Sequence, residues 1–293
     1  MEEDTRGLKH LIIEGMRWNY LLHGLLMYLL GVCIAIYLNI QIDWINGLIG
    51  YLLILLLQTV ESLIGMTKRA SVLKQDREYL NTKQVLLALI AFMMMTLAFL
   101  VVSLFIRGGL TGAGWLYFLI IGVICILKSN YSVGDKLVVF REVIDAILVV
   151  GIIPLFAFNL VSGELHPFLI FINLPLFFLF LGSEVALAFP RYSHDLSKKF
   201  HSLLIQIGWQ RGIFLHDILI ILGFLLLGIS GLIGLPWVLL WPTMTVSLIG
   251  IFEIILLHRI GNGEKPNWKL LRLVAHGLFG LSSYTMIFSL LIN

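Results

Sequence analysis

Basic residues gather in every second connection between long apolar stretches, and this pattern constrains the fold more than any other feature of the chain. Of the 20 Lys and Arg residues, all but Arg107 lie in or beside the N-terminal arm and alternate connections. The apolar stretches are Trp18–Leu38, Ile45–Gly65, Val85–Ile106, Ala113–Leu127, Val143–Phe158, Pro167–Phe189, Ile213–Gly234, Leu235–Leu257 and Leu270–Ile292. Most have about the 20 residues that a helix needs to cross a bilayer core of about 30 Å. The sequence therefore predicts nine transmembrane helices, although the stretches 113–127 and 143–158 are short for a full crossing.

The same charge pattern predicts the orientation in the membrane. An excess of Lys and Arg marks the cytoplasmic side of a membrane protein. We therefore expect the N-terminus inside, the C-terminus outside, and a multi-pass protein of the cell membrane. The connections that carry the basic residues then face the cytoplasm, and an active face is expected there.

Composition restricts the fold class to an all-α bundle. The chain is 59% hydrophobic and 13% charged, which is not the composition of a soluble domain. Only helices and closed barrels satisfy the backbone inside lipid, and apolar runs without alternation exclude a barrel. We expect one integral membrane domain over residues 1–293, with the bilayer as a partner. The net charge of +3 gives no reason to expect a nucleic acid partner.

Five acids lie within the apolar stretches or at their ends, all toward the predicted cytoplasmic side. They are Glu61, Asp145, Glu184, Asp217 and Glu253. An ionisable residue inside a membrane helix is costly and marks a functional region by default. An acid in a first helical turn is favourable, and Asp217 fits that explanation. Glu61, Glu184 and Glu253 are instead expected near helix C-termini, where an acid opposes the dipole. We therefore expect a polar cavity that opens to the cytoplasm.

Two of the predicted cytoplasmic loops are longer and more polar than topology requires. They span Met66–Gln84 and Pro190–Arg211, and both combine cations with carboxylates. Lys and Arg bind phosphate directly, and carboxylates can hold Mg²⁺ against it. If the helix continues past Pro190, Arg191, Asp195, Lys198 and Lys199 share one face of it, because they are spaced at i, i+4, i+7 and i+8. The loops are therefore typical of a site for a phosphorylated ligand.

The second loop also carries a sequence resemblance to a known family. It has the sequence Arg191-Tyr-Ser-His-Asp195-Leu-Ser-Lys-Lys-Phe-His-Ser-Leu203, followed by an apolar stretch that ends at Gly208. Together with nine predicted helices and polar loops after the second and sixth, this resembles the UbiA superfamily of intramembrane prenyltransferases. Members of that family have D-x-x-x-D-R-x-x-G-K-R-T-L in this loop, so Asp195 matches the second aspartate and Arg191 replaces the first.

The first Asp-rich motif of the family has almost no counterpart. The family pattern is roughly N-D-x-x-D-x-x-x-D, and this chain has Gln58-Thr-Val-Glu61-Ser-Leu-Ile-Gly in its place. Glu61 is the only acid there that could take the place of the motif's aspartates. Two or more carboxylates per motif normally hold Mg²⁺ through its hydration shell. A paired-metal site is therefore not expected from one acid at each motif.

The resemblance implies a divergent prenyltransferase that moves an isoprenoid from a prenyl diphosphate to an aromatic or lipid acceptor. The residues implied to hold the diphosphate are Lys68, Arg69, Arg191, Lys198 and Lys199. Mg²⁺ is the implied cofactor, and a single ion would be held by Asp195 with Glu61 or Glu184. Fixed cations can also bind diphosphate, so these Lys and Arg residues could partly replace the metal.

Two other functions remain open. A protein with the same fold could be a non-catalytic subunit that binds isoprenoid or lipid, or a scaffold for a membrane protein partner; the eroded motifs favour this reading. A carrier for a small solute is the third. Transporters place polar groups near the membrane midplane, often where Gly or Pro breaks a helix. Pro154 and Pro175 could break helices, but no charged residue accompanies them, which disfavours transport of an ion.

Overall fold

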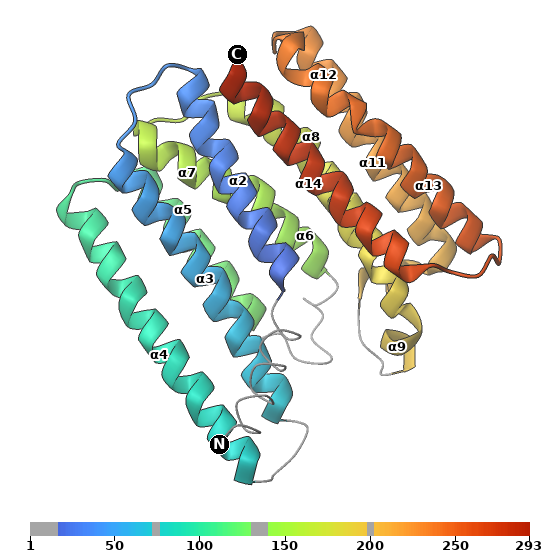
Figure 1. Cartoon of the computed structure of the whole chain (residues 1–293), viewed down its shortest axis with the longest axis horizontal. Coiled ribbons are helices and arrows are strands. Elements are labelled where there is room, and N and C mark those ends of the chain that lie inside the picture. The colour runs from blue at the N-terminus through green and yellow to red at the C-terminus, as the bar shows by residue number, and fades with distance from the viewer. Residues whose placement is uncertain (1–16, 72–76, 130–139, 198–201) are drawn as a thin grey trace.

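The helices of this protein run side by side and alternate in direction along the chain (Figure 1). The computed structural model describes residues 17–71, 77–129, 140–197 and 202–293. Within these residues, nine helical spans are long and apolar enough to cross a membrane. The spans are α2 (Trp18–Tyr37), α3 (Trp44–Ser71), α4 (Arg77–Ile106), α5 (Gly112–Ser129), α6 (Arg141–Ala146) continued by the π-helical segment η2 (Ile147–Ile152) and α7 (Ile153–Ser162), α8 (Phe168–Ala188) continued by η3 (Phe189–Arg191) and α9 (Tyr192–Ser197), α11 (Trp209–Ile233), α12 (Trp237–Thr245) with α13 (Ser247–Gly261), and α14 (Trp268–Ile292). A short helix α10 (Leu203–Ile207) precedes α11.

The helices confirm the predicted all-α membrane bundle and extend several of its spans. The two short stretches lie within helical spans of 18 residues (Gly112–Ser129) and 22 residues (Arg141–Ser162), enough to cross. By contrast, α3 and α4 continue beyond the apolar stretches into the polar connection between them. Residues 66–71 and 77–84 contain no Gly or Pro and are rich in good helix formers, so at these two helix ends the backbone continues to satisfy its hydrogen bonds within the helix.

Proline residues modify the spans without ending them. Pro175 lies inside α8, where its missing N–H leaves the carbonyl of Phe171 without the usual helical partner. The hydroxyl of Ser230 on α11 donates a hydrogen bond to this carbonyl at 2.9 Å. Pro154 lies at the start of α7, directly after the π-helical segment. The helices therefore run through both prolines, and α11 is tied to α8 at the first of them.

The core lies among α2, α7, α8 and α14, and α4 lies at one edge of the bundle (Figure 1). The largest core side chains there, which include Tyr28, Phe156, Phe180 and Phe279, are less than 2% exposed. Only 11% of the most apolar segment of α4 is buried within the protein. Such a helix is apolar on nearly all sides, as expected of a helix that faces lipid.

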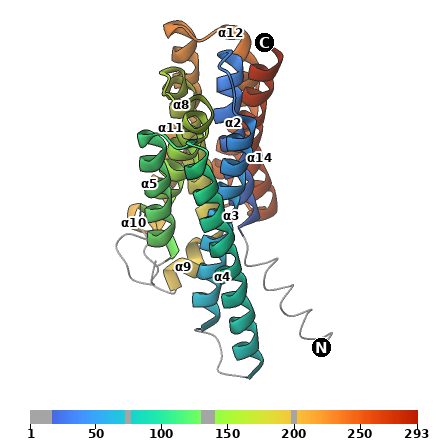
Figure 2. The ribbon, with the colours of Figure 1, turned by 90° about the vertical axis from the view of Figure 1, so that its left-hand side faces the viewer.

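The two ends of the bundle differ in charge. We call the end with the start of α2 and with α9 the basic end; the C-terminus of α14 lies at the opposite end (Figure 2). At the opposite end, Arg107 contacts Asn46 at 2.9 Å and Asp43 at 3.4 Å, which joins the α2–α3 and α4–α5 connections. The backbone N–H of Asn46 and the charge of Arg107 lower the pKa of Asp43. That the basic end faces the cytoplasm remains a prediction.

Candidate functional site

A network of charged side chains and one tyrosine, most of them buried, lies at the basic end and joins five spans. Its members are Arg17 before α2, Tyr20 on α2, Glu61 on α3, Lys128 on α5, Arg141 and Asp145 on α6, and Glu184 on α8. We refer to these residues as the charged network. Within it, three acids and three cations are in contact, so the formal charges balance.

Lys128 is at the centre of the charged network. Its ammonium Nζ lies 2.6 Å from the hydroxyl of Tyr20, 2.8 Å from Oδ1 of Asp145 and 3.0 Å from Oε2 of Glu61. The ammonium also lies 4.0 Å from the centre of the Tyr20 ring, a cation–π distance. The Lys128 side chain is only 2% exposed. Lys128 therefore links α2, α3 and α6 through one buried charge.

Arg17 forms the second half of the charged network. Its Nη2 lies 3.0 Å from Oδ2 of Asp145 and 4.0 Å from Oε2 of Glu184. Burial lowers the pKa of Arg17, but the neighbouring carboxylates of Asp145 and Glu184 outweigh burial and raise it above its usual value. The guanidinium therefore stays charged. Arg141 approaches the same Asp145 carboxylate at 4.0 Å.

Local helix structure explains how these charges are tolerated. Lys128 lies in the last turn of α5, where a cation complements the helix dipole. We expected Glu61 and Glu184 near helix C-termini, where an anion is unfavourable. This was wrong, because α3 continues to Ser71 and the α8 span continues to Ser197. Both acids lie inside their helices, away from the unsatisfied terminal carbonyls, and each contacts a cation.

The structure brings some of the predicted site residues together. Glu61 and Glu184 both belong to the charged network, which connects them through Lys128, Asp145 and Arg17. Arg191, at the end of η3, is exposed, and its charge interacts with those of Arg141 and Glu184.

The remaining predicted residues are less well defined. As predicted, the helix continues past Pro190, which places Asp195 on α9, where it contacts His194 at 3.4 Å. Lys68 and Arg69 lie on the last turns of α3, with side chains outside the described part, and Lys198 and Lys199 lie outside the described residues. The ligand roles of all these residues stay predictions.

Sequence reasoning did not assign Arg17, Tyr20 or Lys128 to the site, and it placed Asp145 only among the five acids at the cytoplasmic side, without a ligand role. The first and third were interpreted only as charges that set topology. Arg17 and Asp145 are 128 residues apart in the chain, and Tyr20 and Lys128 are 108 apart, so no local pattern links them. The one available signal was that Lys128 directly follows an apolar stretch that is short for a full span.

The residues present do not fit a pair of Mg²⁺ ions. Among the described residues, no group of three or more His, Cys, Asp or Glu side chains is arranged to hold a metal. Glu61 is held by Lys128, and Arg17 is the cation nearest to Glu184. Mg²⁺ needs oxygen ligands at about 2.0–2.1 Å in octahedral geometry, and a fixed cation beside each carboxylate opposes that arrangement.

A second buried polar cluster lies between α11 and α13. The carboxylate of Asp217 contacts Nδ1 of His216 at 3.0 Å and Nε2 of His258 at 2.7 Å, and Nε2 of His216 lies 3.5 Å from Oε1 of Glu253. His216 and Glu253 are completely buried. The explanation of Asp217 as a first-turn residue was wrong, because α11 begins at Trp209, two turns earlier. The five acids thus fall into two clusters, not one cavity.

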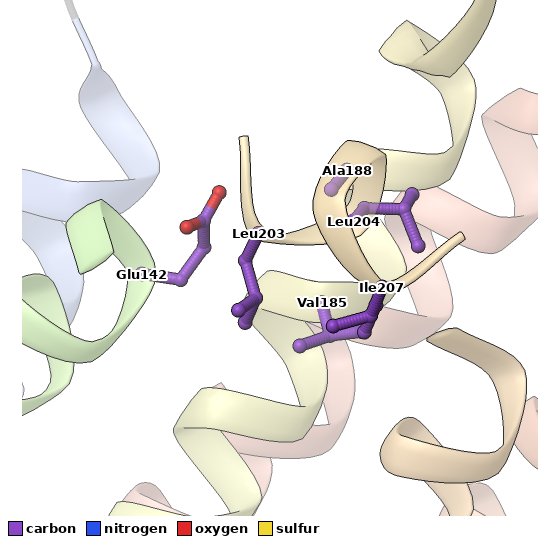
Figure 3. Close-up of a pocket in the computed structure, with 6 residues that line it drawn as sticks. All are labelled: Glu142, Val185, Ala188, Leu203, Leu204 and Ile207. Carbon is purple, nitrogen blue, oxygen red and sulfur yellow. The ribbon is translucent and has the colours of Figure 1, made fainter. Parts of the chain in front are cut away.

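A shallow recess beside the charged network has no room for a water-sized molecule (Figure 3). Its lining residues are Glu142, Val185, Ala188, Leu203, Leu204 and Ile207. An apolar groove of about 440 Å³ lies between α13 and α14. Deeper in the bundle, rings fill the space between α2, α8 and α14: His23 lies 4.9 Å from Phe279, which lies 4.8 Å from Phe180. Neither of these two hollows, both lined by described residues, is an open polar cavity at the basic end, and the predicted cavity stays a prediction.

Comparison with known proteins finds similarity in structure but not in sequence. No protein-family model matches the chain. No curated protein matches it either. Among solved structures, a UbiA homologue from Archaeoglobus fulgidus bound to GPP and Mg²⁺ aligns with a TM-score of 0.63 and 18% identity, over 94% of this chain and 99% of that one. The same homologue bound to Cd²⁺ aligns with a TM-score of 0.59 and 15% identity, over 94% and 99% of the two chains.

A second solved protein extends this likeness. The structure of a digeranylgeranylglyceryl phosphate synthase aligns with a TM-score of 0.66 and 13% identity, over 99% of this chain and 100% of that one. At such low identity these likenesses establish the fold alone. The resemblance inferred from the sequence is thus confirmed at the level of the fold, over nearly the whole chain.

Proposed function

We propose that this chain, which has the fold of the UbiA homologues, is a divergent membrane prenyltransferase. It would transfer an isoprenoid from a prenyl diphosphate to an aromatic or lipid acceptor. The protein would lie in the plasma membrane with its basic end facing the cytoplasm. The prenyl diphosphate and the acceptor would react at that end. The fold likeness to a UbiA homologue solved with GPP and Mg²⁺ supports this substrate class.

The observation that carries the proposal is the convergence of guanidinium groups at the charged network. Arg17 and Arg141 approach the same carboxylate, and their side chains remain 27% and 28% exposed. Arg191 is exposed nearby. A guanidinium has five N–H donors, more than these carboxylate contacts use. The unused donors can bind the oxygens of a diphosphate, for which arginine geometry is well suited.

The same groups would assist the chemical step. When the bond between the first prenyl carbon and the diphosphate oxygen breaks, its electron pair leaves with the diphosphate. Fixed guanidiniums neutralise the charge that develops on this leaving group. The allylic cation that remains forms a bond with a nucleophilic carbon or oxygen of the acceptor, which then loses a proton. Lys68, Arg69, Lys198 and Lys199 would add further positive charge around the diphosphate.

Turnover measurements test the proposal. Purified protein in lipid nanodiscs is incubated with a prenyl diphosphate and a panel of phenolic and lipid acceptors, and diphosphate release is measured. Arg191→Asp restores the family's acid spacing with Asp195, one helical turn away. If Arg191 holds the diphosphate, this change lowers turnover at least tenfold, whereas the exposed control Lys269→Ala leaves it unchanged. Release that needs no acceptor and is unaffected by Arg191→Asp would refute the proposal.

A specific observation also favours the second function, a non-catalytic isoprenoid-binding subunit. The acids on α3 and α8 face internal cations rather than an open site, and aromatic rings fill the space between α2, α8 and α14. Such a protein would bind a prenyl diphosphate without releasing diphosphate. Saturable binding together with no release from any acceptor would select this function.

A further inference from the structure

We infer that ligand binding by this protein is independent of divalent metal. The ammonium of Lys128 lies between the carboxylates of Glu61 and Asp145, where a metal ion would otherwise link α3 to α6. The identity of the ligand rests on the proposed function. The replacement of a metal by an internal ammonium rests only on the geometry of the charged network.

The surroundings of Lys128 are those of a bound cation. Three oxygens from three helices surround Nζ: Tyr20 at 2.6 Å, Asp145 at 2.8 Å and Glu61 at 3.0 Å. Two of these oxygens belong to carboxylates, which are hard donors of the type that also binds Mg²⁺ or Mn²⁺. The Asp145 and Glu61 side chains are 1% and 9% exposed, so a cation at this point is almost sealed from solvent.

Distances and charge both favour the ammonium over a metal. The separations of 2.6 and 3.0 Å to Tyr20 and Glu61 are those of hydrogen bonds donated by the ammonium, and Asp145 lies 2.8 Å away as an ion pair. Mg²⁺ would need the oxygens at about 2.0–2.1 Å. Lys128 and Arg17 already balance the charges of Glu61 and Asp145. A divalent ion added here would meet two fixed cations in a buried region, where repulsion is poorly screened. The side chains of Lys128 and Arg17 therefore supply the positive charge that a metal ion would otherwise provide.

Two consequences follow for experiment. Ligand binding should not respond to a chelator, because an ammonium on the chain cannot be removed by one. Removal of Lys128 should instead create a metal site, since Tyr20, Glu61 and Asp145 would then surround a vacant space with excess negative charge. Lys128→Ala opens that space, whereas Lys128→Met removes the charge but keeps most of the volume.

Mn²⁺ binding measured by electron paramagnetic resonance on purified protein tests this directly. We expect Lys128→Ala to bind one Mn²⁺ at least tenfold more tightly than the wild-type protein does, and Lys128→Met and the exposed control Lys269→Ala to behave like wild type. Adding Glu61→Gln to Lys128→Ala should abolish the gain. If the wild-type protein binds Mn²⁺ stoichiometrically and Glu61→Gln alone removes that binding, the inference is wrong.

A second measurement keeps the inference testable if the Lys128 variants do not fold. Binding of a non-hydrolysable prenyl diphosphate analogue to the wild-type protein is compared in EDTA and in Mg²⁺. Equal affinity supports the inference, and affinity at least tenfold higher in Mg²⁺ overturns it while leaving the proposed function intact. If the analogue binds in neither condition, the proposed function fails, and absence of Glu61-dependent Mn²⁺ binding by the wild-type protein still supports the ammonium in place of a metal.

Discussion

Replacement of Asp145 by Asn should be the most damaging single change in the charged network. Its carboxylate is 1% exposed, with Oδ1 2.8 Å from Lys128 and Oδ2 3.0 Å from Arg17. Asn keeps the shape but removes the charge, which leaves the two cations with only Glu61 and the more distant Glu184. Removing one partner of a buried ion pair costs about 3–5 kcal/mol, so we expect a loss of that size in the free energy of unfolding.

The assay is reversible unfolding in mixed micelles, followed by the helical circular dichroism signal. Glu264→Gln serves as the control, because this acid is exposed at the same end. Combining Lys128→Met with Asp145→Asn removes a cation and an anion together, so the double variant should be more stable than the sum of the single losses, by about 0.5–3 kcal/mol. The reasoning is refuted if the free energy of unfolding of Asp145→Asn lies within about 0.5 kcal/mol of wild type. It is also refuted if the loss in the double variant equals the sum of the two single losses.

Three further predictions concern other parts of the bundle. Ser230→Ala should lower the free energy of unfolding by about 1–2 kcal/mol, because the Phe171 carbonyl loses its hydrogen-bond donor. Ser230→Thr keeps a hydroxyl and should retain the stability of the wild-type protein. Equal losses in the two variants would contradict this explanation. His216→Ala should destabilise by several kcal/mol, since it leaves the buried carboxylate of Glu253 alone, and thermal unfolding will measure this. Asp43, whose pKa is lowered in the folded state, stabilises the protein above its unfolded pKa of about 3.8, and this contribution is lost as pH falls through the folded pKa. The melting temperature of Asp43→Asn should thus lie below that of wild type at pH 7, and the gap should close below pH 4; a constant gap would contradict the assignment.

The spans could be predicted from sequence because bilayer thickness fixes their length, independently of their neighbours. The C-terminal end of α3 and the start of α4 could not be predicted in this way. Helical hydrogen bonds satisfy the backbone as well in a polar segment as in an apolar one. Pro175 illustrates the same limit: its local effect suggests a break, but the carbonyl that it leaves free accepts a hydrogen bond from a hydroxyl on α11, a neighbouring helix far away along the chain. Local propensity is thus overridden by contacts between spans.

The candidate site could be predicted only in part. Buried acids such as Glu61 and Glu184 stand out in an apolar sequence because each is costly there. The sequence does not reveal which cation each acid meets, since Lys128 lies 67 residues from Glu61 along the chain. A lysine at the end of a span is also the usual signal of topology. The role of Lys128 therefore becomes visible only when the helices are packed together.

Equilibrium binding of a non-hydrolysable prenyl diphosphate analogue, measured on the protein in nanodiscs, tests the central claim most directly. The account predicts saturable binding that unlabelled prenyl diphosphate displaces, that Arg191→Ala weakens at least tenfold, and that the exposed control Lys269→Ala leaves unchanged. Absence of saturable binding, or binding that is indifferent to Arg191→Ala, would contradict the claim that the cations at the basic end hold a prenyl diphosphate.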